Sequence, residues 1–412
     1  MAKKKSVLVF SYFSGTQGNC PAEWADDKVK GLLEKFDKVH LVTSLGSKAV
    51  QHENVKTIKV PSLSWNDFKI ELDSEREISG SIPLSAILIG PVAFTLGQLF
   101  DYLIKKITKG ISAGKWSWAL TGFLAGIINL IKIKPDVVLA TGGPMSAQVA
   151  GALLTYFTRI KLITEFQDPL LGAMMQRSSA TRLIASKLES WLLRRAIRAV
   201  YVTKSAAEQV RERNPLLKDK VEAIYPGAWN YKIPKKQSSE NNETIELLHL
   251  GTLYGSRNLD FLFQAIDALL LEGVLKPNKI KIVNVGSVYL ENVKDYRERS
   301  DFKEIESMNR VNALRRASNT DGLILVQHSD ERSKETIPYK TYDYFNLNIP
   351  IIGILNNKEL EDLIVENSGL TSRQGDVESI KDALKSFLQT IDNNKVPYNS
   401  FEFSEQIEKL MR

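Results

Sequence analysis

The chain contains the stretch Asp321-Gly-Leu-Ile-Leu-Val-Gln327, which leads into Glu335-Thr-Ile-Pro-Tyr-Lys-Thr-Tyr-Asp343-Tyr-Phe-Asn-Leu-Asn-Ile-Pro-Ile-Ile-Gly353. The apolar run from Leu323 to Val326 predicts a short buried strand, and the run from Pro350 to Ile354 predicts the next one. Between them we expect a polar loop and then a helix that starts near Tyr339. A strand, loop, helix and strand in this order form one unit of a parallel sheet.

Two carboxylates, Glu335 and Asp343, stand eight positions apart in this unit. Ligands of parallel sheets bind beyond the carboxyl ends of the strands, where loops and positively polarised helix N-termini gather. The pattern resembles the nucleotide-sugar site of retaining glycosyltransferases with the GT-B fold. The resemblance implies that Glu335 lies near the sugar hydroxyls of the donor, with a catalytic role, and that Asp343 lies near its ribose hydroxyls. The alternative for Glu335 is a solvated loop residue, as isolated acids usually are.

The motif Ile-Pro338-Tyr-Lys340-Thr-Tyr-Asp343 supports the same resemblance. The family usually has Ile-Pro-x-Lys-x-x-Glu-Tyr here, so Asp343 has a shorter arm but keeps two acceptor oxygens. The resemblance implies that Pro338, Lys340 and Asp343 take part in donor binding. Lys340 would supply positive charge for the donor diphosphate.

A glycine-containing loop occurs earlier, in Leu248-His-Leu-Gly-Thr-Leu-Tyr-Gly-Ser-Arg-Asn258. Glycines after a strand let backbone amides approach a phosphate, and a guanidinium matches diphosphate oxygens. We therefore expect Gly251, Gly255 and Arg257 at the donor, with Arg257 also stabilising the leaving diphosphate. The loop resembles that of family-4-type glycosyltransferases, although Thr252 stands where that family commonly has an arginine. The alternative for Arg257 is a surface residue that caps the loop.

Predicted strands alternate with longer helical patterns along the chain. They fall at Ser6–Phe10, Val39–Val42, Val137–Ala140, Lys161–Thr164 and Ala199–Val202 in the first half, and at Glu246–Leu250, Lys279–Val285, Leu323–Val326 and Ile349–Ile354 in the second. Such alternation implies right-handed crossovers and parallel sheets covered by helices. The predicted fold class is therefore α/β, with two Rossmann-like doubly wound domains, which the GT-B resemblance implies face a central cleft.

A polar, charged segment from Tyr231 to Thr244 separates the two halves. We predict an acceptor-side first domain over residues 1–228, a linker over 229–244 and a nucleotide-sugar-binding domain over 245–395. The GT-B resemblance implies that residues 396–412 form a helix that crosses back onto the first domain.

Two strand-end loops of the first domain carry further candidates. Gly15 lies in the loop after the first strand, and the resemblance implies that it faces the donor, although any tight turn can use glycine. Asp168 lies in Glu165-Phe-Gln-Asp-Pro169, which resembles an Asp-x-Arg-Asp-Pro signature of some of these enzymes, with Gln167 in place of the arginine. We expect Asp168 to be a catalytic residue on the acceptor side. The alternative is a helix N-cap before Leu170.

Composition excludes several classes of protein. The 412 residues are 43% hydrophobic and 25% charged, as in ordinary globular domains. The single cysteine, Cys20, excludes an intrachain disulfide and fits a reducing cytoplasm. No Asp-x-Asp occurs, and the four histidines lack metal-ligand spacing, so we expect no metal and no cofactor apart from the nucleotide sugar as substrate. Phosphate-loop, nucleophile-elbow and dinucleotide-binding motifs are also missing, and the first residues leave no room for a signal peptide.

Residues 82–100 carry no charge, and residues 116–131 form a second uncharged run. Two interpretations of the segment from 82 to 131 stay open. In the first, the runs are buried or partly buried helices of a large domain. In the second, they form a monotopic surface whose apolar side chains enter the membrane interface while lysines meet anionic head groups. The lysines are Lys105, Lys106, Lys109 and Lys115, with Lys132 and Lys134 after the second run.

The resemblance implies a glycosyltransferase of bacterial cell-envelope polysaccharide synthesis. It would move a sugar from a nucleotide sugar to a glycan or lipid-linked acceptor with retention of configuration. We expect it in the cytoplasm, with the inner membrane surface as a partner under the monotopic interpretation and with no nucleic acid partner. Two alternatives stay open. The first is an inverting GT-B transferase that acts on a lipid-linked precursor, because residues 135–144 also resemble a segment of such enzymes. The second is a non-catalytic GT-B-like subunit that anchors a partner enzyme at the membrane.

Overall fold

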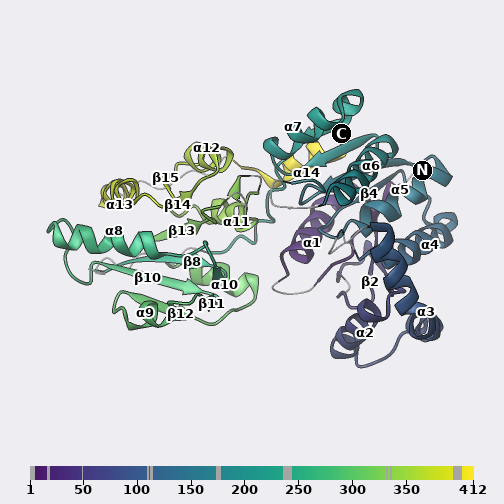
Figure 1. The fold of residues 1–412 in the computed structure, drawn as a ribbon, viewed down its shortest axis with the longest axis horizontal. Helices are drawn as coiled ribbons and strands as arrows, with labels where there is room; N and C mark the ends of the chain where they lie inside the picture. The colour runs from purple at the N-terminus through teal and green to yellow at the C-terminus, as the bar shows by residue number, and fades with distance from the viewer. Residues whose placement is uncertain are drawn as a thin grey trace. The chain divides into compact units, whose positions relative to one another are not determined.

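The computed structural model describes residues 5–15, 19–48, 50–108, 111, 115–172, 178–234, 244–330, 333–334, 336–392 and 401–412. The chain forms two compact units. In Figure 1 the first runs from purple to teal and includes the yellow C-terminal helix, and the second runs from green to yellow. Unit 1 comprises Met1–Pro226 and Ser404–Arg412, and unit 2 comprises Gly227–Phe403.

In the described part of unit 1, a seven-stranded parallel sheet has the order β3-β2-β1-β4-β5-β6-β7. Val7 of β1 pairs with Val39 on one side and with Val137 on the other, which fixes the register at the centre of the sheet. The strands are β1 (Ser6–Phe10), β2 (Lys38–Ser44), β3 (Val55–Val60), β4 (Val137–Ala140), β5 (Lys161–Phe166), β6 (Arg198–Tyr201) and β7 (Val221–Ala223).

Helices cover both faces of this sheet because successive strand side chains point in opposite directions. Val7 and Val9 pack with α1 and with Leu410 of α14, whereas Leu8 and Phe10 pack with α4 to α7. The helices are α1 (Cys20–Leu32), α2 (Trp65–Ser79), α3 (Leu84–Thr108), α4 (Trp116–Ile133), α5 (Ser146–Thr158), α6 (Ser179–Arg195), α7 (Lys204–Arg213) and α14 (Phe403–Met411), with a 3-10 turn at Pro215–Lys220.

Unit 2 has a six-stranded parallel sheet in the order β12-β10-β8-β13-β14-β15. Helices α8 and α13 pack on one face, where Ile324 and Val326 of β13 point. The strands are β8 (Ile245–Leu250), β10 (Ile280–Val285), β12 (Phe302–Ile305), β13 (Gly322–Val326), β14 (Ile351–Leu355) and β15 (Leu370–Arg373), and β9 (Leu253–Tyr254) pairs with β11 (Val288–Tyr289). The helices are α8 (Asp260–Leu271), α9 (Val293–Glu298), α10 (Arg310–Ala317), α11 (Lys340–Leu347), α12 (Lys358–Glu366) and α13 (Val377–Asp392).

The predicted α/β class with two parallel sheets is confirmed. All the predicted strands are present, with ends that differ by at most two residues, and α11 is the helix expected near Tyr339. The strands β3, β7, β9, β11, β12 and β15 were not predicted. Helix α14 belongs to unit 1 apart from its first residue, and residues 235–243 of the predicted linker lie outside the described residues.

Helices α3 and α4 differ in how far the protein covers them. Helix α4 packs against β1, β2, β3 and α5, and Trp118 is fully buried, which fits the core interpretation. Helix α3 packs closely on α2 at Gly97. A Cβ at this position would lie only 2.6 Å from the backbone nitrogen of Trp65, so a larger residue would not fit. The larger apolar side chains of α3 are exposed while its small residues are buried, so α3 is partly buried and both interpretations stay open for it. More than half of the surface is exposed in Leu84, Ile87, Leu88, Phe94, Leu99 and Ile107.

By length and composition alone, α3 and α4 could each cross a membrane.

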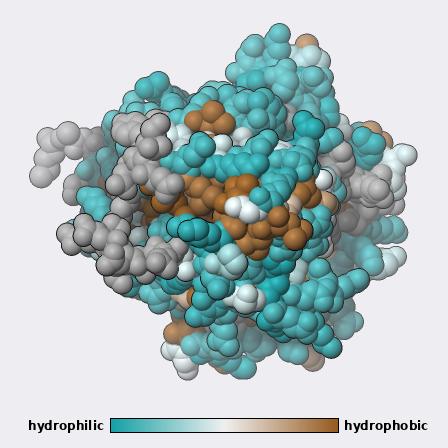
Figure 2. All heavy atoms as spheres, turned by 90° about the vertical axis from the view of Figure 1, so that its left-hand side faces the viewer, coloured by the Kyte–Doolittle hydropathy of each residue, from teal (hydrophilic) through white to brown (hydrophobic). Residues whose placement is uncertain are grey.

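Figure 2 shows the side of the molecule that lies on the left in Figure 1, where hydrophobic residues gather in a band amid hydrophilic ones. In the described part of unit 2, the exposed large hydrophobic residues are spread over β9, the end of α8, β11 and α12. In unit 1 such residues are concentrated along α3, and a smaller number lie along α4, namely Leu120, Leu124, Ile128 and Ile131.

Candidate functional site

The carboxyl edge of the unit 2 sheet contains a topological switch point. Strand β10 lies on one side of β8 and β13 on the other, so the strand order reverses direction there. Parallel sheets bind ligands at such points, outside the carboxyl ends of the strands. Gly251 follows β8, Gly286 follows β10 and Gln327 follows β13. The predicted glycine loop therefore lies where the topology favours a ligand.

Two glycines bring the loops after β8 and β10 together. Gly251 has a φ of +119° and Gly286 a φ of +141°, which residues with a Cβ rarely adopt. A Cβ on Gly286 would lie 2.6 Å from the carbonyl carbon of Gly251, so no side chain fits there. A Cβ on Gly251 would lie 3.5 Å from Nζ of Lys340. Gly251 thus presents bare backbone beside the Lys340 amine.

Lys340 is the centre of a buried polar network. Its Nζ donates to the carbonyl of Leu250 across 2.7 Å and lies 2.7 Å from Nε2 of His249. Nδ1 of His249 lies 2.6 Å from Oδ1 of Asn284, whose amide nitrogen donates to the Gly286 carbonyl. Because an amide oxygen only accepts, Nδ1 of His249 carries the proton and Nε2 accepts from Lys340.

The electrostatics of this network favour an anionic ligand. Burial, with the nearby charge of Arg257, holds the pKa of Lys340 well below its ordinary range. Burial, with the charge of Lys340, also lowers the pKa of His249 well below its ordinary value. A neutral lysine amine has two N–H groups, which match the two acceptors around it. An anion beside Lys340 would favour the ammonium form, so the site gains positive charge as an anion binds.

Arg257 closes a tight turn after β9. Tyr254 and Arg257 exchange two backbone hydrogen bonds of 3.1 Å, and Gly255 between them has a φ of +54°. The Arg257 guanidinium lies 5.4 Å from the centroid of the Tyr254 ring. Gly255 therefore shapes the turn that carries Arg257, and the charge of Arg257 acts on Lys340.

Asp343 in the first turn of α11 is buried against Arg310 of α10. Nη2 of Arg310 donates to Oδ1 of Asp343 across 2.6 Å, and Nε lies 3.1 and 3.2 Å from the two carboxylate oxygens. The same guanidinium lies 5.3 Å from the ring of Tyr231 and 5.0 Å from that of Tyr339. The Asp343 carboxylate thus anchors Arg310, a partner that the sequence did not indicate.

The other predicted residues of this motif are placed only in part. Pro338 precedes α11, and its carbonyl accepts a hydrogen bond from the Thr341 N–H across 2.9 Å. It therefore shapes the start of the helix that carries Lys340. Glu335 lies outside the described residues, so of the two predicted carboxylates only Asp343 has a described position.

Gly15 in unit 1 has a structural explanation. Its φ is +66°, and a Cβ at this position would clash with the Cβ of Lys48. Its N–H lies 3.0 Å from both carboxylate oxygens of Asp26. A phosphate would have to replace this hydrogen bond, so the donor contact expected of Gly15 stays a prediction that the local geometry does not favour.

Asp168 follows β5 and is exposed. The described residues up to 172 contain no helix that starts at Leu170, and the next helix, α6, has Ser178 as its N-cap, so the N-cap interpretation of Asp168 is wrong. Glu165, at the end of the same strand, is buried and pairs with Lys28 across 2.9 Å. Although Asp168 as a whole is exposed, burial of its carboxyl group raises the pKa of Asp168. Asp168 lies at the carboxyl edge of the sheet, and its catalytic role stays a prediction.

No protein-family model matches this chain, and no curated protein matches its sequence. Solved structures match its fold. HepE of Anabaena in complex with UDP-glucose has a TM-score of 0.58 at 12% identity, over 98% of this chain and 94% of that one. Sucrose-phosphate synthase from Thermosynechococcus elongatus has a TM-score of 0.60 at 12% identity, over 99% and 95%. A glycosyltransferase from Rickettsia africae ESF-5 has a TM-score of 0.59 at 12% identity, over 99% and 93%.

These matches cover nearly the whole of each chain, so both parallel-sheet units take part in the likeness. The chain has the GT-B fold, as the resemblance of its motifs implied.

Proposed function

We propose that this GT-B chain is a glycosyltransferase that takes its sugar from a nucleotide sugar. The observation that carries the proposal is the Lys340 network at the switch point of unit 2, where bare glycine backbone meets a buried lysine amine whose protonation a bound anion would favour. A diphosphate is stabilised by such an arrangement of backbone amides and cations. HepE, which shares the fold, was solved with UDP-glucose, and this supports a UDP-sugar as donor.

In the proposed complex, the diphosphate lies against the Gly251 backbone near Lys340 and Arg257. Lys340 supplies a compact charge, and Arg257 supplies a planar fork of donors. Both stabilise the negative charge that develops on the departing nucleoside diphosphate. The bond from the anomeric carbon to the phosphate oxygen breaks as the acceptor hydroxyl attacks on the same face and gives its proton to the departing diphosphate oxygen. Configuration is therefore retained without a covalent protein intermediate. Glu335 and Asp168 remain candidates for orienting the sugar and the acceptor.

Asp343 has a different role in this proposal from the one that its motif implies. Its two oxygens already accept hydrogen bonds from Arg310, and both side chains are nearly buried. We assign Asp343 to positioning: it holds Arg310 and the start of α11, which carries Lys340. A ribose hydroxyl could still share one of its oxygens.

A second candidate is a non-catalytic GT-B subunit. Thr252 replaces a cation that the resembling family commonly has, and the Asp343 carboxylate is engaged with Arg310. Release of UDP from a UDP-sugar by the purified chain distinguishes an enzyme from such a subunit. The anomeric configuration of the product, read by NMR, distinguishes retention from the inverting alternative.

We also propose that the chain works at a membrane surface in cell-envelope synthesis, with α3 lying in the interface. The exposed apolar residues of α3 supply the area-dependent attraction, and Lys105 and Lys106 in its last turn are exposed toward anionic head groups. Lys115 takes no part, because its Nζ pairs with Asp67 across 2.6 Å. Lys109 lies outside the described residues. If α4 crossed the bilayer, it would lose its contacts with β1 to β3, so we favour a surface orientation.

The experiment that tests the donor site is a screen of nucleotide sugars against thermal unfolding. UDP-, GDP-, ADP- and dTDP-sugars are added to the full chain, because a ligand that binds the folded state raises stability in proportion to RT ln(1 + [L]/Kd). Stabilisation by one nucleotide class supports the proposal. A chain that none of them stabilises argues against it.

A further inference from the structure

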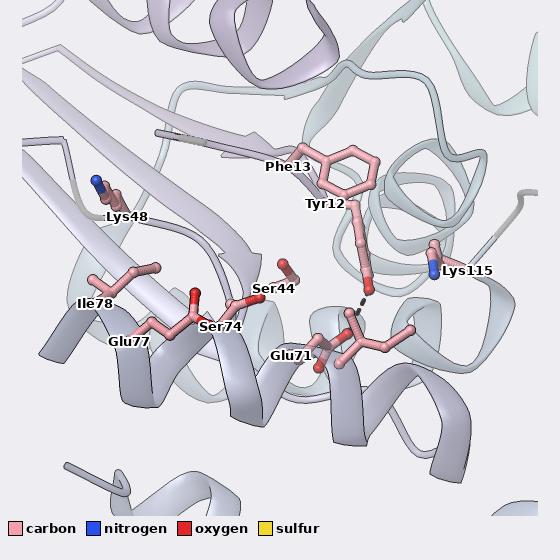
Figure 3. Close-up of a pocket in the computed structure, with 11 residues that line it drawn as sticks. Tyr12, Phe13, Ser44, Lys48, Glu71, Ser74, Glu77, Ile78 and Lys115 are labelled. Atoms are coloured by element: carbon pink, nitrogen blue, oxygen red, sulfur yellow. Dashed lines mark hydrogen bonds between the residues drawn. The ribbon is translucent and has the colours of Figure 1, made fainter. Parts of the chain in front are cut away.

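Unit 1 contains a pocket of about 480 Å³ that the donor site does not use. Tyr12 and Phe13 follow β1, Ser44 ends β2, and Glu71 and Ser74 lie on α2 opposite them. Figure 3 shows the Tyr12 hydroxyl pointing at Glu71 across the pocket. The pocket therefore lies between the carboxyl ends of two central strands and one helix.

Glu71 forms the polar floor of this pocket. Its Oε1 accepts from the hydroxyls of Tyr12 and Ser62, each at 2.6 Å, and its Oε2 accepts from the Ser62 N–H at 2.8 Å. A carboxylate has about four acceptor positions, so Oε2 keeps one of them for a ligand. Burial raises the pKa of Glu71 to about 7, so the carboxylate form predominates only above this pH.

Apart from Glu71, the charged groups around the pocket come in pairs of opposite charge. Lys115 at one end pairs with Asp67 across 2.6 Å and lies 5.7 Å from the centroid of the Tyr12 ring. At the rim, Lys48 and Glu77 are exposed and opposite in charge. The Glu71 carboxylate adds one negative charge to these two pairs, so a phosphate would find no excess of positive charge here. A neutral group with several hydroxyls suits the hydroxyl and carboxylate oxygens of the floor.

The mouth of the pocket also has apolar residues beside Lys48 and Glu77. Ile70 and Ile78 line it and are 61% and 36% exposed, whereas Glu71 is 3% exposed. On another side of α2, Trp65 packs edge-on against Phe94 of α3, with ring centroids 5.2 Å apart. Helix α2 therefore borders both the polar pocket and the exposed apolar helix α3.

We propose that this pocket binds the head group of an amphipathic acceptor, with a hydroxyl of the head group on Oε2 of Glu71 and an apolar chain over Ile70 and Ile78 toward α3. The inference rests on the proposed function, in which such a molecule receives the sugar. It adds the binding site and the acceptor class: a neutral, hydroxyl-rich head group joined to an apolar chain. Glu71 is a binding residue in this proposal.

The test is calorimetric binding of n-octyl glucoside to the full chain, below the concentration at which this probe forms micelles. We expect one site in the wild-type chain and at least about tenfold weaker binding in Glu71→Gln, because the variant loses a charge-assisted hydrogen bond. The matched control is Glu75→Gln. Glu75 is also buried on α2, but its Oε2 pairs with Lys59 across 2.6 Å and it does not line the pocket. The affinity of Glu75→Gln for octyl glucoside should stay within about twofold of the wild-type value.

A second variant keeps the test decisive if Glu71→Gln does not fold. Ser74 is half-buried at the pocket wall, so Ser74→Leu should fill the pocket and abolish binding of the probe. Wild-type affinity in Ser74→Leu, or in a folded Glu71→Gln, would place the probe elsewhere, such as on α3, and overturn the site. Equal binding of glucose and octyl glucoside would overturn the amphipathic class.

The donor site is measured on the same samples with UDP. A wild-type chain that binds UDP but not octyl glucoside contradicts the pocket alone. A chain that binds octyl glucoside through Glu71 but binds neither UDP nor another nucleoside diphosphate contradicts the proposed function. The pocket would then bind an amphipathic molecule that is not a sugar acceptor.

Discussion

Nζ of Lys340 lies 2.7 Å from Nε2 of His249, and the two residues are 91 positions apart in the chain. The contact joins the start of α11 to the end of β8, the two elements that carry the donor motifs. Because burial holds the pKa of Lys340 well below its ordinary range, an uncharged amine can occupy this position until an anion binds. The number of protons that the chain takes up when a ligand binds therefore tests whether Lys340 is uncharged in this contact.

We expect UDP binding to take up about one proton at a pH between the lowered pKa of free Lys340 and its ordinary value, because the diphosphate favours the ammonium form. Calorimetry in buffers of different ionisation enthalpy measures this uptake. Lys340→Met should remove the uptake and weaken UDP binding, whereas Lys358→Met, on the exposed face of α12, should change neither. Proton uptake that persists in Lys340→Met would assign the titration to another group.

Asp343→Asn should destabilise the chain by about 3 kcal/mol, because it leaves the buried Arg310 guanidinium without the charge of its carboxylate partner. Urea unfolding measures the loss. Adding Arg310→Met should restore part of the stability, since the unmatched charge is then gone as well. A loss below about 0.5 kcal/mol, the range of ordinary surface changes, would show that the ion pair is not structural and would favour the ribose role.

The stability of unit 1 should depend on pH through Glu71. Its pKa is raised from 4.5 to about 7, chiefly by burial and against the hydrogen bonds of Ser62 and Tyr12, with Asp67 also raising it. The folded state then holds a proton that the unfolded state releases between these pH values, so the contribution of Glu71 to stability is present below pH 4.5 and is lost as pH rises through about 7. The change amounts to about 3 kcal/mol.

The measurement for Glu71 is the free energy of unfolding of wild type minus that of Glu71→Gln across this pH range. The nearby groups that face Glu71 are Tyr12, Asp67 and Lys115, and Tyr12 stays protonated because burial and the Glu71 charge raise its pKa. The difference should fall as pH rises from 4.5 to 7. A flat difference would mean that the Glu71 carboxyl is not buried in solution.

Binding to anionic liposomes should require both the apolar face of α3 and the lysines at the helix ends. Phe94→Ser with Leu99→Ser should weaken binding at all salt concentrations, because apolar area is not screened. Replacing four exposed lysines with glutamine should weaken it mainly at low salt, by about 1 kcal/mol per lysine near the surface. These lysines are Lys105, Lys106, Lys132 and Lys134, and the control set is Lys218, Lys276, Lys294 and Lys303.

Sedimentation with liposomes measures this binding. The control set should bind like wild type. If the wild-type chain stays in the supernatant at low salt, the proposal that α3 binds membranes is contradicted. The exposed apolar face of α3 would then need another partner.

The sequence predicted every strand in the interior of the two sheets and missed the strands at their edges. Central strands such as β1 and β13 have neighbours on both sides and helices on both faces, so they appear as continuous apolar runs. The unpredicted β3, β7, β12 and β15 are the four sheet edges. Edge strands carry polar residues, as in Val55-Lys-Thr-Ile-Lys-Val60, and are easily mistaken for loops.

Local motifs indicated Gly251, Arg257 and Lys340, because the glycines and cations of such motifs lie a few positions apart in the sequence. The partners that give these residues their chemistry come from distant segments, and no short pattern marks them. His249 seemed to be one of four scattered histidines, yet its ring holds the Lys340 amine. Glu71 belongs to no motif that the sequence analysis identified, and it is buried by the packing of α2 against the ends of β1 and β2.

The central measurement is the unfolding temperature of the full chain as UDP is added. At about 100 times Kd, a ligand stabilises the folded state by about 2.7 kcal/mol, which should raise the unfolding temperature by several degrees. We expect this rise in wild type and in Arg297→Ala, whose arginine is exposed and pairs with Glu304. Arg257→Ala and Lys340→Met should show little or no rise. An unfolding temperature that neither UDP nor any other nucleoside diphosphate changes would contradict a donor site at the carboxyl edge of unit 2.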